Sequence, residues 1–196
     1  MSVDFLSADQ RRHFGRFAGE PTAEQIARYF HLDETDRQHT RSRHGDHNTL
    51  GFALQLGTVR FLGTFLSQMN EVPPGVIAYL AHQLEIKDPS CLQRYQDQVR
   101  WRHVHEISKL YGYRAFHDQP GHWQLIRWLY VRAWLGAERP SVLFDHAAAW
   151  LVERKTLLPG ITTLARLIGR IRDRALARLW QVLNSATSAE QRARLE

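Results

Sequence analysis

The stretch PGITTLARLIGRIRDRALARLWQVL, residues 159–183, decides the fold class of this chain. Its apolar residues recur at spacings of three and four, which is the period of the buried face of an α-helix. That face consists of Leu164, Leu167, Ile168, Ile171, Ala175 and Leu179. We therefore expect one long amphipathic helix from about residue 160 to residue 183.

The same stretch places a row of arginines on the surface of the expected helix. They are Arg166, Arg170, Arg174 and Arg178. Like charges four residues apart cost about 0.2–0.5 kcal/mol per pair, and Asp173 relieves only part of this repulsion. A polyanion would stabilise the row, and the hydroxyls and backbone N–H groups of Thr162 and Thr163 at the helix start suit a phosphate. We interpret the row as a DNA contact; a solvated face, or pairing with acids elsewhere in the fold, is the alternative.

Helix signals punctuate the rest of the chain as well. A capping box at Thr22-x-x-Gln25 predicts the start of one helix, and a second is expected from Asp33-x-x-Asp36 to Gly45. A third is expected to follow an Asn48 cap from Leu50 to about Leu62, and others to begin at Pro73-Pro74 and at Pro89-Ser90. Further helices are expected from about Asp97 to Leu110, with a stop at Gly112, and over residues 122–136 and 141–156. No run of alternating β-branched residues is bounded by hairpin turns. The sequence therefore predicts an all-α fold.

Two turn or cap signals bear on domain organisation. The cluster Asp118-Gln119-Pro120-Gly121 indicates a boundary between two helical modules, 1–118 and 119–196. The capping box at Ser188-x-x-Gln191 opens a helix only one or two turns before Glu196, which is too short to persist unsupported. We interpret this ending as a fragment of a longer polypeptide, with a frayed natural C-terminus as the alternative.

The charge of the chain is basic and unevenly placed. Lys and Arg number 26 against 20 Asp and Glu, giving +6, and 23 of the 26 are Arg, whose planar fork binds phosphate bidentately. Residues 37–60 carry +3 (four Arg, one acid), residues 100–132 carry +4 (six basic, two acidic), and residues 159–196 carry +4 (seven Arg, three acids). Acidic or neutral segments separate these blocks. Such clustering favours a polyanionic partner.

The first basic block surrounds a predicted tight turn at Gly45. No apolar residue lies between Glu34 and His44, so we do not expect core burial to hold the helix that precedes the turn. A polar helix, a Gly turn and a buried helix resemble a helix-turn-helix-like unit, which reads DNA in the major groove. The candidate contacts in and around this turn are Arg37, Arg41, Arg43, His44 and Asn48. A solvated loop is the alternative.

The second basic block, Arg100-Trp101-Arg102-His103-Val104-His105-Glu106, interleaves bases with aromatic residues. Such a pattern can stack on nucleobases. We favour the interpretation that Trp101, Val104 and Leu110 form an ordinary core face, and base stacking stays the alternative.

Signatures of catalysis, metal binding, disulfides and membranes are missing from the sequence. His103 and His105 point about 200° apart on a helix, and no His-Glu-x-x-His, Gly-x-Ser-x-Gly or phosphate loop occurs. Cys91 has no second cysteine to pair with, no apolar run approaches the ~20 residues of a membrane span, and the N-terminus has no signal-peptide pattern. We expect a cytoplasmic, non-enzymatic chain with no metal, no cofactor and no membrane contact.

Four motifs in order resemble the N-terminal region of the class II, or Tn-three family, replicative transposases. They are Asn48-x-Leu50-Gly51-Phe52-Ala53-x-Gln55-Leu56 with Arg60 downstream, the Pro73-Pro74 helix ending in Gln83-Leu84, His105-Glu106-Ile107 leading to Gly112-Tyr113-Arg114-x-Phe116, and Leu158-Pro159-Gly160-Ile161-Thr162-Thr163-Leu164-x-Arg166-Leu167. One departure is Thr49, where relatives often carry a basic residue, which weakens the expectation of a phosphate contact there.

The resemblance implies sequence-specific binding of double-stranded DNA at the terminal inverted repeats of a transposon, and it adds Arg60 and Arg114 to the expected DNA contacts. It places the chemistry of transposition and DNA recombination, and any self-association, in C-terminal regions of a far longer polypeptide from a bacterial mobile element. On this basis the chain itself is not an enzyme. The alternative from another class is a helical interaction or regulatory module whose basic faces bind an acidic protein.

Overall fold

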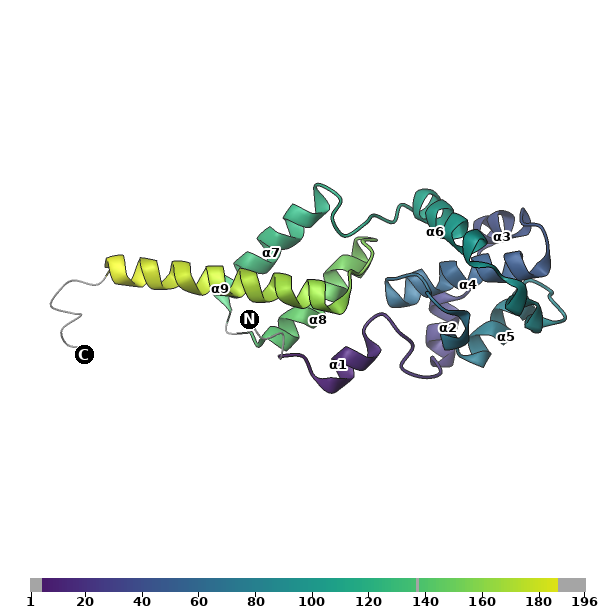
Figure 1. Ribbon diagram of the computed structural model, residues 1–196, viewed down its shortest axis with the longest axis horizontal. Coiled ribbons are helices and arrows are strands. Elements are labelled where there is room, and N and C mark those ends of the chain that lie inside the picture. The colour runs from purple at the N-terminus through teal and green to yellow at the C-terminus, as the bar shows by residue number, and fades with distance from the viewer. Residues whose placement is uncertain (1–4, 137, 187–196) are drawn as a thin grey trace. The chain divides into compact units, whose positions relative to one another are not determined.

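The computed structural model describes residues 5–136 and 138–186, and helices joined by turns and loops make up most of this part of the chain (Figure 1). The α-helices are α1 (Ala8–His13), α2 (Ala23–Tyr29), α3 (Glu34–Arg41), α4 (Asp46–Leu62), α5 (Pro74–Gln83), α6 (Asp97–Tyr111), α7 (Gly121–Leu135), α8 (Pro140–Glu153) and α9 (Ile161–Ala186), with short 3₁₀ helices at Met69–Glu71 and Pro89–Arg94. Extended pairing within the described ranges is limited to one isolated bridge between Arg114 and Thr156. The all-α prediction is confirmed. The capping box at Ser188-x-x-Gln191 lies outside the described residues.

The described residues fall into two compact units. The larger unit contains residues 8–116 and 151–158, and the smaller unit contains residues 5–7, 117–136, 138–150 and 159–186. The segment 151–158 is tied to the larger unit by backbone hydrogen bonds. The N–H groups of Leu157 and Leu158 donate to the carbonyls of Arg114 and Gly63, each at 2.9 Å. The larger unit therefore uses residues from two separate parts of the chain.

Helix α4 is the centre of the larger unit. Every residue from 50 to 59 is buried, and side chains from α2, α5, α6 and Pro89–Arg94 pack around it. A Cβ atom on Gly57 would lie 2.3 Å from the Phe30 ring, and one on Gly51 would lie 2.5 Å from the Tyr95 ring. Glycine is required at both positions because these two rings pack directly against the helix backbone.

The predicted Asn48 cap of α4 is wrong. The helix begins at Asp46 rather than at Leu50, and its N-cap is Gly45 with φ +83°, a conformation that favours glycine. The side chain of Asn48 instead donates from Nδ2 to the carbonyl of His44 at 2.8 Å. Several other signals are confirmed: the Thr22 and Asp33 capping boxes form, α5 begins at Pro74, and Gly112, with φ +74°, caps the end of α6.

The predicted end of α3 and its predicted lack of buried residues are both wrong. The helix ends at Arg41 rather than at Gly45, and burial does hold it in place. Asp36 and Thr40 are buried, and the Asp36 carboxylate accepts hydrogen bonds from Arg60 at 2.7 and 2.8 Å and from the Tyr111 hydroxyl at 2.8 Å. A buried ion pair therefore takes the place of the apolar face that the sequence lacks.

The core face of α6 is also different from the predicted one. Trp101 and Leu110 are 66% and 44% exposed, whereas His103 and Ile107 are buried. The His103 ring lies edge-on to Phe52, with ring centroids 5.2 Å apart, and its Nδ1 is 2.8 Å from the Tyr95 hydroxyl. A histidine can occupy this core position because its ring nitrogen has a hydrogen-bond partner.

The smaller unit is built from α7, α9 and the first part of α8. On α9 the predicted apolar face is confirmed, since Leu164, Leu167, Ile168, Ile171 and Ala175 are buried and Leu179 is half-buried. They pack in a unit whose core also contains Leu125 and Leu129 of α7. This packing fixes which side of α9 is left to solvent. Within the described ranges, no helix has both the length and the apolar character needed to cross a membrane.

Candidate nucleic-acid interface

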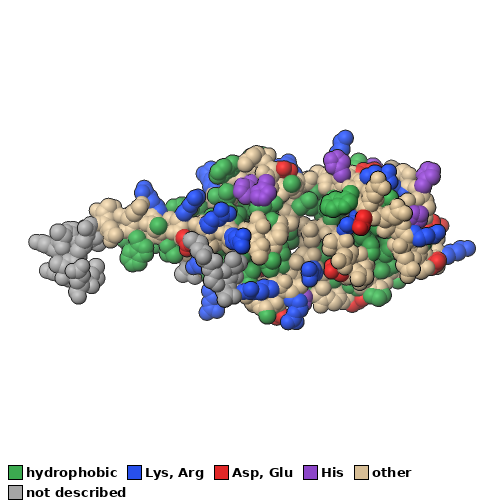
Figure 2. All heavy atoms as spheres, viewed as in Figure 1, with side chains coloured by type: hydrophobic (Ala, Val, Ile, Leu, Met, Phe, Trp, Pro, Cys, Tyr) green, Lys and Arg blue, Asp and Glu red, His purple; other side chains and the backbone are tan. Residues whose placement is uncertain are grey.

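The outer side of α9 carries the arginine row predicted from the sequence. Arg166, Arg170, Arg174 and Arg178 are all exposed, and Figure 2 shows Lys and Arg side chains distributed along this helix. Their Cα atoms rise about 6 Å along the axis from one arginine to the next. The Arg178 guanidinium hydrogen-bonds Gln181 at 3.3 Å. The other three have no hydrogen-bond or ion-pair partner among residues 5–136 and 138–186. We refer to these four residues as the α9 arginine row.

The start of α9 lies next to the first of these arginines. Thr162 and Thr163 are exposed in its first turn, and the N–H groups of Thr163 and Leu164 bond the Gly160 carbonyl at 2.9 and 3.2 Å. Both threonines are therefore at the surface on the same helix as the arginine row, but the Thr163 N–H that the sequence assigned to a phosphate is engaged by Gly160. The structure thus brings Thr162, Thr163 and the arginine row together on one element.

Arg60, by contrast, is committed to an internal ion pair. Its guanidinium binds both oxygens of Asp36 and lies 5.3 Å from the centre of the Tyr111 ring. Burial alone would raise the pKa of the Asp36 carboxyl, but the hydrogen bonds from Arg60 and Tyr111 outweigh this effect and hold that pKa below its ordinary value. Arg60 therefore stabilises the contact between α3 and α4.

Arg43 is committed in the same way. It binds both oxygens of Glu106 at 2.6 and 2.7 Å, and its guanidinium lies 4.2 Å from the centre of the Phe52 ring. The Arg43 side chain is only 14% exposed. The hydrogen bonds from Arg43 lower the pKa of the Glu106 carboxyl. Arg43 therefore joins the turn between α3 and α4 to α6.

The same turn forms one wall of a polar hollow of about 260 Å³ in the larger unit. The turn contributes Arg43 and His44, the first turn of α4 contributes Asn48, and α6 contributes Arg102, His103 and Glu106. The Oδ1 atom of Asn48 is buried and has no hydrogen-bond partner in the described part of the chain. Since Nδ2 is engaged by the His44 carbonyl, the open position is a hydrogen-bond acceptor. Three of the predicted contact residues therefore meet at one polar surface.

Arg37, Arg41 and Arg114 do not line this hollow. Arg41 and Arg114 are exposed, and Arg37 is half-buried. The backbone of Arg114 is fixed by its hydrogen bonds to Lys155 and Leu157, both at 2.9 Å, so its side chain extends from a rigid position. The structure does not gather these three residues with the turn at Gly45 into a single cluster of contacts.

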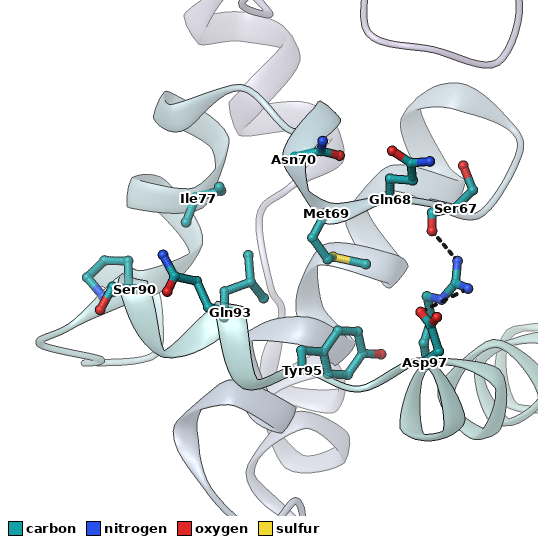
Figure 3. Close-up of a pocket in the computed structure, with 12 residues that line it drawn as sticks. Ser67, Gln68, Met69, Asn70, Ile77, Ser90, Gln93, Tyr95 and Asp97 are labelled. Carbon is teal, nitrogen blue, oxygen red and sulfur yellow. Dashed lines mark hydrogen bonds and ion pairs between the residues drawn. The ribbon is translucent and has the colours of Figure 1, made fainter.

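Arg100 lines a second hollow, of about 760 Å³ (Figure 3). Its wall combines amide and hydroxyl side chains with apolar ones, mostly from residues 67–70 and 89–97. Arg100 donates to the carbonyls of Leu66, at 3.1 Å, and Ser67, and it pairs with Asp97 at 3.1 Å. These bonds attach the loop before Met69–Glu71 to α6, so Arg100 has a structural role.

The outer side of α6 carries a set of exposed residues, for which the sequence favours a core role for Trp101 and leaves base stacking as the alternative. Trp101, Arg102, His105 and Lys109 are all exposed. The spacing of Trp101, His105 and Lys109, every four residues, could have indicated a shared helix face, but Trp101 was assigned to the core. Within the described ranges, no group of three or more His, Cys, Asp or Glu side chains is placed to hold a metal ion.

These observations define an all-α protein with an exposed row of arginines, which have no acidic partner in the part of the chain that the structure describes. The chain belongs to the family described as a domain of unknown function (DUF4158), whose model matches residues 5–171. It is 50% identical over 197 residues to the transposase for transposon gamma-delta of Escherichia coli (strain K12), a match that covers 100% of this chain and 20% of that protein.

More distant relatives agree with this assignment. The transposase for transposon Tn1546 of Enterococcus faecium is 28% identical over 196 residues, covering 98% of this chain and 19% of that protein. The transposase for transposon Tn501 of Pseudomonas aeruginosa is 28% identical over 194 residues, covering 97% and 19%. The predicted resemblance to Tn-three family transposases is confirmed, and the chain spans about a fifth of the length of the curated relatives it matches.

Proposed function

We propose that this chain binds double-stranded DNA and recognises the terminal inverted repeats of a transposon as the DNA-binding part of a transposase. Its relatives are transposases, and the chain matches about a fifth of their length. We assign it a binding role in the cytoplasm rather than a catalytic one. Cleavage and strand transfer would then belong to the other four fifths of such proteins.

The α9 arginine row is the observation that carries this proposal. Three neighbouring guanidinium groups repel one another and have no acidic partner among the described residues, whereas the opposite face of the helix is buried. A row of phosphates offsets this repulsion, and arginine binds phosphate bidentately. Thr162 and Thr163 supply further hydrogen-bond donors at the start of the helix.

We assign the reading of base edges to the turn between α3 and α4. His44 and Asn48 line the polar hollow there, and Arg41 is exposed just before the turn. Arg37 and Arg114 would bind the backbone. Arg43 and Arg60 hold internal carboxylates, so we assign them the positioning of this turn and of α3 rather than direct contact with DNA.

Equilibrium binding measured at two salt concentrations tests the proposal. A labelled duplex carrying the terminal inverted repeat of the parent transposon is compared with a random duplex of equal length by fluorescence anisotropy. The inverted repeat should bind at least tenfold more tightly. The double variant Arg166→Ala/Arg170→Ala should bind both duplexes more weakly and flatten the dependence of log K on log salt by about 1.8, since each lost phosphate contact removes about 0.9.

The matched control is Arg127→Ala/Arg139→Ala, which removes the same charge from exposed positions of the same unit. This control should keep the slope of the wild-type chain. Salt-sensitive binding without sequence preference would reduce the proposal to general polyanion affinity. Absence of binding to both duplexes would favour the alternative, a module that binds an acidic protein.

A further inference from the structure

The outer face of α6 combines exposed cations with an exposed aromatic ring. Trp101, His105 and Lys109 follow one another every four residues, about 6 Å apart along the helix axis, with Arg102 beside them. The Trp101 ring is 66% exposed and has the Arg100 guanidinium 5.4 Å from its centre. We call Trp101, Arg102, His105 and Lys109 the outer α6 face. It is a different surface from the α9 arginine row, because the two belong to different units.

The charges of the outer α6 face are not balanced within the larger unit. Arg102 and Lys109 have no ion-pair or hydrogen-bond partner among residues 5–136 and 138–186. The two acids nearest to them on α6 are already engaged, since Glu106 binds Arg43 and Asp97 binds Arg100. Two exposed positive charges therefore lie on α6 near a large exposed ring, and Arg102 also lines the polar hollow.

We propose that the outer α6 face is a second surface for duplex DNA, on which the sugar–phosphate backbone lies. This inference rests on the proposed function and extends it to a surface of the larger unit. Arg102 and Lys109 would bind phosphates as cations. The indole N–H of Trp101 would donate to a phosphate oxygen while its ring packs against deoxyribose. Backbone contacts of this kind fix the register of a protein on DNA and carry no sequence information.

Lysine footprinting tests the inference on the unmodified chain. Lys109 is one of only three lysines, with Lys87 and Lys155. Acetylation of each is measured by mass spectrometry with and without a saturating duplex. DNA should protect Lys109 at least fivefold and leave Lys87, which is exposed elsewhere on the same unit, unchanged. Equal reactivity of Lys109 in the free chain and in the complex would overturn the inference, and so would equal protection of Lys87.

Substitution gives a second readout. Arg102→Ala/Lys109→Ala should weaken binding of the inverted repeat and of random duplex by about tenfold and flatten the salt slope by about 1.8. Trp101→Ala should weaken both by about threefold, and Trp101→Phe by less because the ring is kept. The control Lys87→Ala/Arg94→Ala removes the same charge from exposed positions of the same unit and should leave the slope unchanged.

The outcomes separate this inference from the proposed function. Binding that depends on the α9 arginine row but not on the outer α6 face would overturn the inference and leave the proposed function intact. Absence of DNA binding by the wild-type chain would overturn both. Protection of Lys109 by polyglutamate but not by duplex DNA would assign the face to an acidic protein and overturn the inference.

Discussion

The arginines of α9 and those around α4 are the same residue type in opposite situations. Arg166, Arg170 and Arg174 have no acidic partner in the described structure, whereas Arg43 and Arg60 each grip a carboxylate on a neighbouring helix. The local sequence does not distinguish the two groups, since both lie in basic blocks. The difference arises because the fold brings Asp36 to Arg60 of α4 and Glu106 to Arg43 in the turn before α4. An arginine is available to a ligand only where the fold provides no such acid.

The largest test of this contrast is to remove Arg60. Arg60→Ala leaves the Asp36 carboxylate, which is 1% exposed, buried without its partner. Breaking a buried pair from one side costs about 3–5 kcal/mol of unfolding free energy. Urea denaturation followed by circular dichroism measures this loss. The double variant Arg60→Met/Asp36→Leu should recover much of it, and a single variant as stable as wild type would contradict the structural role of Arg60.

The next largest effect is expected on acidification, through the buried His103 close to Arg43. Burial, and secondarily the charge of Arg43, lower the pKa of His103 to about 4 from 6.5. Because the unfolded chain then binds more protons, the stabilisation is complete above pH 6.5 and is lost as the pH falls from 6.5 to 4. Denaturation midpoints measured across this range should fall, and His103→Gln should fall less steeply. Equal pH dependence in the two chains would contradict the assignment.

Replacing Arg43 should have a smaller effect than replacing Arg60. Glu106, the partner of Arg43, is 40% exposed and can be solvated when the pair is broken. We expect Arg43→Ala to cost about 1–2 kcal/mol, mainly through the lost contact with the Phe52 ring. Arg43→Lys, which keeps the charge without the planar fork, should recover only part of it. A cost as large as that of Arg60→Ala would remove the distinction between the two pairs.

The smallest effect on stability is expected on the other side of the comparison. Arg170→Ala should change the unfolding free energy by less than about 0.5 kcal/mol, since it removes two repulsive neighbours and no attractive contact. The same substitution should weaken DNA binding. A large loss of stability without a change in binding would place Arg170 with Arg43 and Arg60 and would break the contrast.

Local signals predicted the helices well and the core of α6 poorly. Capping residues and the 3.6-residue period act within one turn of helix, so the start of α5 and the buried face of α9 could be predicted from nearby residues. By contrast, Arg60, which pairs with buried Asp36, lies 24 residues further along the chain. Tyr95, which hydrogen-bonds buried His103, lies eight residues before it. A buried polar side chain leaves no periodic trace. For this reason Trp101 was predicted in the core and His103 was not.

The same limit explains the candidate site. The α9 arginine row follows from helical phase alone, and the structure leaves it exposed as phase predicts. Whether Arg43 faces a ligand or a carboxylate depends on α6, which is more than 50 residues further along the chain. The outer α6 face is not predicted as an exposed face, because placing Trp101 in the core rotates the predicted buried side of α6 by about half a turn from the observed one.

The return of residues 151–158 to the larger unit has a consequence for the order of folding during synthesis. Residues 117–150, with α7 and most of α8, are inserted within the sequence of the larger unit, whose last backbone bonds need Leu157 and Leu158. At about 5–20 residues per second, a ribosome takes roughly 2–8 s to travel from residue 117 to residue 158. During that interval the carbonyls of Gly63 and Arg114 lack the N–H groups of Leu158 and Leu157, which have not yet been synthesised. A fragment ending at residue 118 keeps that gap permanently.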